Sequence, residues 1–331
     1  MKRFFTVALI ALLSCIVVYA NGDDKKRLDQ QHRPDDKNKV DNTDKGKKGG
    51  KGGKGGKGGK GGKGGKGGKD GKGKNKVDDG TYKPNVLQFV VEGVPFEMVE
   101  VRGGTFTMGA SSASESWGDD RPTHKVTVGD YYIAKTTVTQ GLWRAIMGTT
   151  LTDFASQLGV DTYGVGDDYP MYFISWDDCK EFIGKLNEIT QMNFRLPTEA
   201  EWEFACRGGK NSKKYKYSGS NDIDEVAWYS GNSNASTQPV ARKAPNELGI
   251  YDMSGNVWEW CSDWFGFYTR DSQDNPTGPA SGDDRVMRGA GFSSYADETL
   301  LHTRYYGNPA KCYNNFGFRL ALTYSGKRPK R

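Results

Sequence analysis

The segment 252–264, DMSGNVWEWCSDW, carries a carboxylate in surroundings that exclude water. Its glutamate, Glu259, lies between two tryptophans, and a buried carboxylate without a partner is costly. Such a group must be protonated, paired with a basic side chain or bound to a cation. The segment contains no Lys or Arg, so one alternative is an ion pair with a distant arginine such as Arg288 or Arg319.

Oxygen atoms close to Glu259 in the sequence favour a hard cation as the other alternative. Asp252, Ser254 and Asn256 supply side-chain oxygens, and Gly255 allows a tight turn that directs backbone carbonyls inward. Ca²⁺ prefers about six to eight oxygen ligands, which a turn of this kind provides. The chemistry of the segment therefore allows calcium beside the arginine alternative, and the spacing is only loosely similar to known calcium loops and too short for an EF-hand.

The cysteines do not indicate a zinc site. The cysteines beyond the first 20 residues form no CxxC pair and have no histidine at zinc spacing. They are Cys179, Cys206, Cys261 and Cys312. Their number allows several disulfide pairings in an oxidising compartment, and buried thiols are an equally good interpretation.

Short strands and a few helices must position these groups. Apolar and β-branched runs predict strands at 98–101, 105–108, 124–128, 131–138 and 317–322. Helices are predicted after three N-cap residues: Thr139, Ser175, and Thr198, which forms a capping box with Glu201. The rest is rich in Gly, Asn, Asp and Ser, so we expect an irregular α+β domain, because long irregular segments usually serve a binding surface or a metal.

The chain divides into three parts by composition. Residues 1–20 have a basic start and a short apolar run that ends in Val-Tyr-Ala, which predicts a cleaved signal peptide. A retained membrane anchor is one alternative, and lipid attachment at Cys15 is another. Residues 21–76 hold a lysine at every third position from Lys48 to Lys69 and almost no apolar side chains, which predicts a disordered linker. Residues 77–331 form the predicted folded domain.

Charge is distributed unevenly between these parts. The linker holds 19 Lys and Arg against 8 Asp, and Lys2 and Arg3 add two more positive charges. Because the whole chain carries a net charge of +6, residues 77–331 carry −7. Nucleic-acid binding by the domain is therefore not expected. The linker suits an anionic surface, such as lipid headgroups or an envelope polysaccharide, or serves only as a soluble spacer.

Seven segments, in order, resemble the sulfatase-modifying-factor family, which includes the formylglycine-generating enzymes. They are EVRGGTFTMG, HKVTVGDYYIAKTTVT, YPMYFISWDDCKEF, FRLPTEAEWEFACRGG, PNELGIYDMSGNVWEWCSDW, RVMRGAGF and NNFGFRLAL. They cover roughly residues 95–323, almost the whole of the predicted domain. The resemblance implies a C-type-lectin-like fold. It also implies calcium ligands from the Asp252 and Glu259 side chains and the backbone carbonyls of Gly255 and Val257.

The resemblance also implies copper chemistry, from which this sequence departs. The enzymes oxidise a substrate cysteine with oxygen and copper(I), which two cysteines hold just after the segment that matches RVMRGAGF. The corresponding positions here are Ser294 and Thr299. A hydroxyl is a poor ligand for soft Cu(I), so copper is not expected. Iron held by His124, His302 and a carboxylate would require the two histidines to meet in space, and the sequence gives no reason to expect this.

A binding role remains. The stretch 291–316 corresponds to the substrate cleft of the enzymes and to the variable surface of lectin-fold binding proteins. It offers a candidate recognition surface, in which Tyr and Arg combine contact area with hydrogen bonding. Its residues are Tyr295, His302, Arg304, Tyr305 and Asn308. Some of them, Arg304 and Tyr305 above all, have packing within the domain as an equal alternative.

The sequence thus predicts an exported, calcium-stabilised binding or assembly module without copper oxidase activity. Its expected location is the periplasm, the cell envelope or the medium, and its partner an envelope protein or a glycan. The alternative is an oxidoreductase that generates formylglycine in sulfatases or performs a related metal-dependent oxidation.

Overall fold

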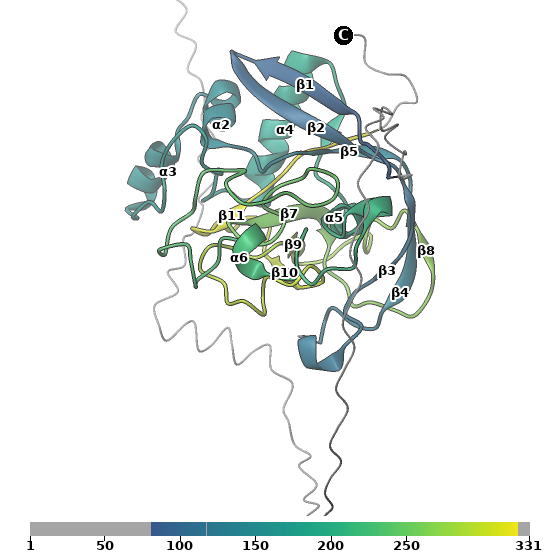
Figure 1. Cartoon of the computed structure of the whole chain (residues 1–331). Coiled ribbons are helices and arrows are strands. Elements are labelled where there is room, and N and C mark those ends of the chain that lie inside the picture. Colours follow the sequence, from purple (N-terminus) through teal and green to yellow (C-terminus); the bar gives the residue numbers. More distant parts are fainter. Residues whose placement is uncertain (1–80, 117, 324–331) are drawn as a thin grey trace, which may run out of the picture. The chain divides into compact units, whose positions relative to one another are not determined.

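A computed structural model describes residues 81–116 and 118–323 of the chain (Figure 1). The predicted signal peptide, Cys15 and the whole of the predicted Lys/Gly-rich linker lie outside these residues. Among the described helices, none combines the length and the apolar character needed to cross a bilayer.

The described strands form three small sheets. Their bounds are β1 Val86–Val91, β2 Val94–Val101, β3 Gly104–Met108, β4 His124–Val128, β5 Tyr131–Ala134, β6 Phe194–Arg195, β7 Trp258–Trp264, β8 Gln273–Asp274, β9 Arg285–Arg288, β10 Arg304–Gly307, β11 Phe316–Gly317 and β12 Ala321–Thr323. The strand orders are β1-β2-β5-β12-β6, β10-β9-β7-β11 and β3-β4-β8. The C-terminal β12 lies between β5 and β6, so the two ends of the domain meet in one sheet.

Five α-helices occur in the described residues, each with a polar N-cap. They are α2 Gln140–Met147, α3 Leu151–Leu158, α4 Trp176–Thr190, α5 Glu199–Cys206 and α6 Ile223–Val226. Capping boxes begin α3, α4 and α5, and left-handed glycines end α2 and α3. Such caps satisfy backbone groups that a short helix cannot satisfy internally.

The predicted α+β class is confirmed, and several elements lie where the sequence placed them. The strand predicted at 124–128 coincides with β4, and α2, α4 and α5 follow their predicted caps. The strand predicted at 131–138 ends at Ala134, because the next residues bond elsewhere: Val138 N–H, for example, donates to Phe318. Helices α3 and α6 were not predicted, and the strand predicted at 317–322 is divided between β11 and β12.

One core cluster lies where α2 and α4 pack against the largest sheet (Figure 1). Trp143 of α2 stacks on Phe182 of α4 with 5.4 Å between ring centroids, and both rings are fully buried. A second cluster surrounds α5, which contacts β3, β4, β7 and β9. Helix α5 therefore connects two sheets, and it presents its acidic face to strands that carry arginines.

Candidate functional site

The hydroxyls at the two positions that the resemblance assigns to copper-binding thiols are buried. Ser294 and Thr299 lie in the loop between β9 and β10. Ser294 Oγ accepts a hydrogen bond from Gly291 N–H at 3.2 Å, and Thr299 Oγ1 donates to the Ala296 carbonyl at 2.7 Å. Both hydroxyls thus stabilise local turns, and this donor set does not fit Cu(I).

The four cysteines of the described residues are buried, and no disulfide joins them to one another. Burial raises the pKa of Cys206 to about 12 and raises the pKa of Cys179 and Cys261 well above the usual thiol value. Cysteines in this state are thiols at neutral pH, and a metal requires the thiolate. The buried-thiol alternative, and not a disulfide, is what the structure shows.

The predicted recognition surface is only partly at the surface. Tyr295 is 54% exposed and Asn308 is exposed, whereas Tyr305 is half-buried and packs against Trp258. His302 and Arg304 are buried, and each pairs with an acid, so neither side chain is part of an exposed recognition surface. For Arg304 the structural alternative applies, because its guanidinium is fully engaged inside the domain.

The two histidines of the domain have separate surroundings. His302 Nδ1 lies 2.9 Å from Asp120 Oδ2, and the His124 ring packs on Tyr268 with 4.7 Å between centroids. Residues 81–116 and 118–323 contain no group of three or more His, Cys, Asp or Glu side chains arranged to hold a metal. The described residues thus supply no iron site of the type considered from the sequence.

Glu259 has the arginine partner that the sequence offered as an alternative to calcium. Its carboxylate is fully buried in β7, and Arg319 donates to both oxygens, each at 2.6 Å. Trp202 Nε1 of α5 donates to the same carboxylate, also at 2.6 Å. Between them these donors use both oxygens, so Glu259 is electrically compensated without a metal.

The turn that precedes Glu259 has the predicted form. Gly255 is left-handed at φ +82°, and a Cβ there would lie 2.2 Å from the Trp228 carbonyl oxygen, so only glycine fits. Val257 N–H bonds back to the Gly255 carbonyl. Asp252 is buried and accepts from Ala241 N–H, and burial raises the pKa of its carboxyl to about 6. Among the described residues, Asp252 therefore forms no ion pair, whereas Glu259 pairs with Arg319.

A buried network of charged residues joins α5 to β9 and β10. Arg304 donates to both oxygens of Glu199, at 2.5 and 2.8 Å, and Arg288 donates to Glu199 at 3.0 Å and to Glu203 at 2.5 Å. Burial alone would raise the pKa of Glu203, but Arg207 and Arg288 hold it at about 2. The network was not predicted, although the spacing of Glu199 and Glu203, four residues apart on one helix face, was a signal for it.

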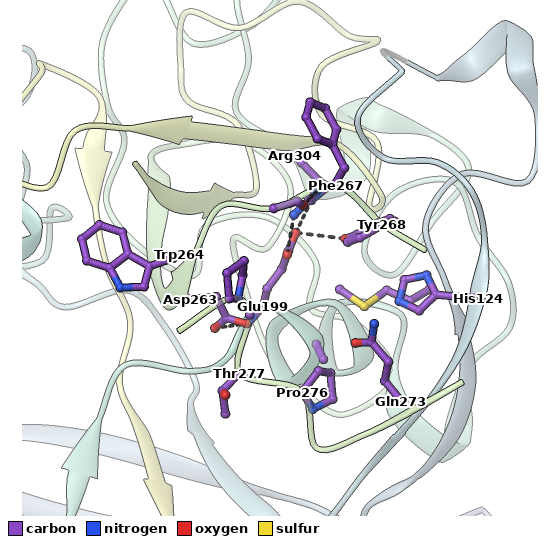
Figure 2. A pocket seen from close by; sticks show the side chains of 15 residues that line it. His124, Glu199, Asp263, Trp264, Phe267, Tyr268, Gln273, Pro276, Thr277 and Arg304 are labelled. Carbon is purple, nitrogen blue, oxygen red and sulfur yellow. Dashed lines mark hydrogen bonds and ion pairs between the residues drawn. The ribbon is translucent and has the colours of Figure 1, made fainter. Parts of the chain in front are cut away.

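A cavity of about 390 Å³ lies beside this network (Figure 2). Segment 263–268, loop 276–279 and Gln273 supply most of its wall, and Met108, His124, Glu199, Ala200 and Arg304 complete it. Glu199 accepts a hydrogen bond from Tyr268 Oη at 3.0 Å in addition to its arginines, so its charge is satisfied. Apart from Arg304, the lining residues were not singled out from the sequence as binding residues.

Known proteins resemble this chain over most of the described region. Residues 90–324 match the "Sulfatase-modifying factor enzyme 1-like domain". "Chaperone protein LppX" of Paenibacillus barcinonensis is 33% identical over 218 residues, which is 51% of this chain and 71% of that protein. The formylglycine-generating enzyme of Streptomyces coelicolor is 33% identical over 175 residues, which is 46% of this chain and 52% of that enzyme.

A solved structure agrees with the fold. That of Treponema denticola variable protein 1 aligns with a TM-score of 0.64 and 30% identity, and the alignment covers 72% of this chain and 99% of that one. The match over residues 90–324 extends over more than half of the chain. The chain therefore belongs to the sulfatase-modifying-factor family, whose members include formylglycine-generating enzymes.

Proposed function

We propose that the protein is an exported, calcium-stabilised member of the family that acts as a binding or assembly module at the cell envelope, and not as a copper oxidase. One observation carries the proposal. Hydroxyls occupy the two thiol positions, and each is engaged with nearby backbone. The chemistry of copper oxidation requires soft thiolate ligands at this place, and the described cysteines lie elsewhere as buried thiols.

Three further features support a module of this kind. A relative carries the name chaperone protein, and a structural neighbour the name variable protein; neither name states an oxidation. The apolar, leader-like first 20 residues support export. The lone buried carboxyl of Asp252, beside the carbonyl-rich turn at Gly255, supports calcium. The partner would be an envelope protein or a glycan that contacts Tyr295 and Asn308.

The competing function is oxidation of cysteine to formylglycine, which the similarity to the Streptomyces enzyme favours. The two are separated by incubating the purified protein with Cu(I), oxygen and a Cys-x-Pro-x-Arg peptide, and measuring aldehyde by mass spectrometry. We expect no turnover and no tight Cu(I) binding. The double variant Ser294→Cys/Thr299→Cys is the matched control, and we expect it to gain Cu(I) binding because it restores two soft ligands.

Aldehyde formation by the unmodified protein at enzyme-like rates would end the proposal. The binding role is tested separately with envelope glycans and peptidoglycan fragments. Tyr295→Ala should weaken any such binding, and Ile189→Ala, which removes a similarly exposed apolar side chain from α4, should not.

A further inference from the structure

Asp263 has a buried carboxyl group in the wall of the cavity of Figure 2, and it forms no ion pair with any residue that the structure describes. Its side chain in β7 is 3% exposed. Oδ2 accepts hydrogen bonds from Glu199 N–H at 3.0 Å and Ser262 Oγ at 2.9 Å. No described residue donates to Oδ1, and no described Lys, Arg or His lies within ion-pair distance. By contrast, Glu199, Glu203 and Glu259 each have an arginine.

The cations near Asp263 are engaged elsewhere. Arg304 lines the same cavity, but its guanidinium donates to both carboxylate oxygens of Glu199. Arg285 is sandwiched between Trp264 and Trp176, with its guanidinium carbon 3.4 and 3.9 Å from the two ring centroids, and it donates to the Ser262 carbonyl. When Asp263 is ionised, as it is above about pH 7, its buried charge calls for a counter-ion from outside the described residues.

The cavity has the size and lining of a small-molecule site. Its volume of about 390 Å³ lies within the usual range for such sites, roughly 300–1,000 Å³. The wall combines apolar surfaces, from Met108, Phe267, Pro276 and Pro279, with a few polar groups, from Gln273 and Thr277. Phe267 is 80% exposed, so it offers an aromatic surface to an incoming ligand. An aliphatic arm would pack on these surfaces while its charged end reaches Asp263.

The geometry discriminates among cations. A calcium ion requires about six oxygens or more, and the described residues form no metal-binding cluster here. A guanidinium prefers a carboxylate with both oxygens open, whereas Oδ2 of Asp263 is already in use. A quaternary ammonium requires an aromatic cage, but Trp264 already contacts the Arg285 guanidinium, and Tyr268 contacts the Arg304 guanidinium and the tilted ring of His124. A primary ammonium, which is a compact point charge with three donors, fits best.

We propose that this cavity binds a primary alkylammonium group, such as a lysine side chain of a ligand, with Asp263 as its counter-ion. The apolar wall receives the methylene arm, and Gln273 offers its amide oxygen to a second ammonium hydrogen. Tyr295 and Asn308, the exposed residues of the proposed recognition surface, do not line this cavity. The inference therefore does not depend on the proposed function.

The test is a calorimetric titration of the full chain at pH 8 with N-acetyl-lysine methylamide. N-acetyl-norleucine methylamide, which has the same aliphatic arm without the ammonium, is the control ligand. We expect saturable binding of the lysine compound and at least tenfold weaker binding of the norleucine compound. Asp263→Asn should weaken lysine-compound binding at least tenfold, and Asp283→Asn, an equal charge change at an exposed position, should alter it less than twofold.

A second variant separates recognition from folding. Asparagine at position 263 retains an oxygen for Glu199 N–H, so we expect Asp263→Asn to melt as a folded protein. Gln273→Lys leaves Asp263 in place and puts a tethered ammonium on the cavity wall, so it should also abolish binding of the lysine compound. Undiminished binding by either folded variant, equal binding of the norleucine compound, or no saturable binding of the lysine compound would overturn the proposal.

Discussion

At the scale of single residues, two buried carboxyls that form no ion pair with the described residues, Asp252 and Asp263, contribute to stability in a way that depends on pH. Burial, joined by the charge of Glu199, raises the pKa of Asp263 to about 7, and burial raises the pKa of Asp252 to about 6. An acid whose pKa is higher in the folded state binds its proton more tightly there than in the unfolded chain. Its stabilising contribution is complete below about pH 4 and is lost as the pH rises through the folded pKa.

Asp263→Asn should therefore flatten the stability profile between pH 4 and pH 7. The shift of Asp263 from an ordinary value corresponds to a loss on the order of 4 kcal/mol across this window, which the variant should not show. Glu199 and Glu201 of α5, Arg195, Arg285, Arg304 and His124 face the same region and remain in both proteins. Urea denaturation at half-unit pH steps measures the difference, and parallel profiles for the two proteins would contradict the assignment.

Calcium binding at the turn near Gly255 can also be tested at a single residue, Asp252. If calcium is bound at the turn, a chelator should lower the melting temperature by about 5 °C or more relative to millimolar calcium. Asp252→Ala should remove this response, because its carboxyl is the proposed ligand that has no arginine partner. Glu259 is a poorer probe, since its replacement also leaves Arg319 buried without an acid. Equal melting temperatures in calcium and chelator would contradict a calcium site at this turn.

At the scale of elements, α5 is fixed to β9 and β10 by charges inside the domain. Arg288→Met should cost about 3–5 kcal/mol, because the substitution leaves Glu203 and Glu199 with fewer cationic partners in a dry environment. Arg242→Met is the matched control: Arg242 and Asp168 are both mostly exposed, and such pairs contribute at most about 1 kcal/mol. Denaturant midpoints measure the stability of both variants. Similar losses of stability in the two variants would show that the buried charge network does not stabilise the domain more than an exposed ion pair does.

The same helix shows what a sequence reveals and what it does not. The start of α5 was predictable because a capping box is a local pattern, with Thr198 and Glu201 three residues apart. The partners of its acids were not, since Arg288 and Arg304 lie 85 to 105 residues away and a single sequence does not pair them. Glu259 shows both cases. The flanking tryptophans were enough to predict that its carboxylate is buried, but only the fold shows that its partner is Arg319.

His302 was expected on the recognition surface and is buried, and Arg304 follows its packing alternative. His302 and Arg304 have the residue types of a recognition surface, but burial depends on which distant segments cover a loop. Here Asp120 and Glu199 cover them. The cavity around Asp263 was missed because its wall comes from β3, β4, α5, β7 and the loops that follow, so no single stretch of sequence contains its pattern.

At the scale of the whole molecule, the separation of charge predicts where the chain meets an anionic surface. The array from Lys48 to Lys69 places eight lysines at regular spacing, whereas residues 77–331 carry net negative charge. Each lysine near an anionic membrane contributes up to about 1 kcal/mol, and the attraction weakens as salt shortens the Debye length. We therefore expect the full chain to cosediment with vesicles that contain anionic lipid, through the array and not through the domain.

Replacing the eight array lysines by glutamine keeps the chain length and removes the charge. This variant should bind the anionic vesicles at least tenfold more weakly at low salt, and raising the salt to about 0.3 M should reduce binding of the unmodified protein similarly. Vesicles of neutral lipid are the control and should bind neither protein. Equal binding by the glutamine variant would place the contact on another part of the chain, and salt-independent binding would exclude an electrostatic origin. Either result would leave the array as a spacer, the alternative that its composition also allows.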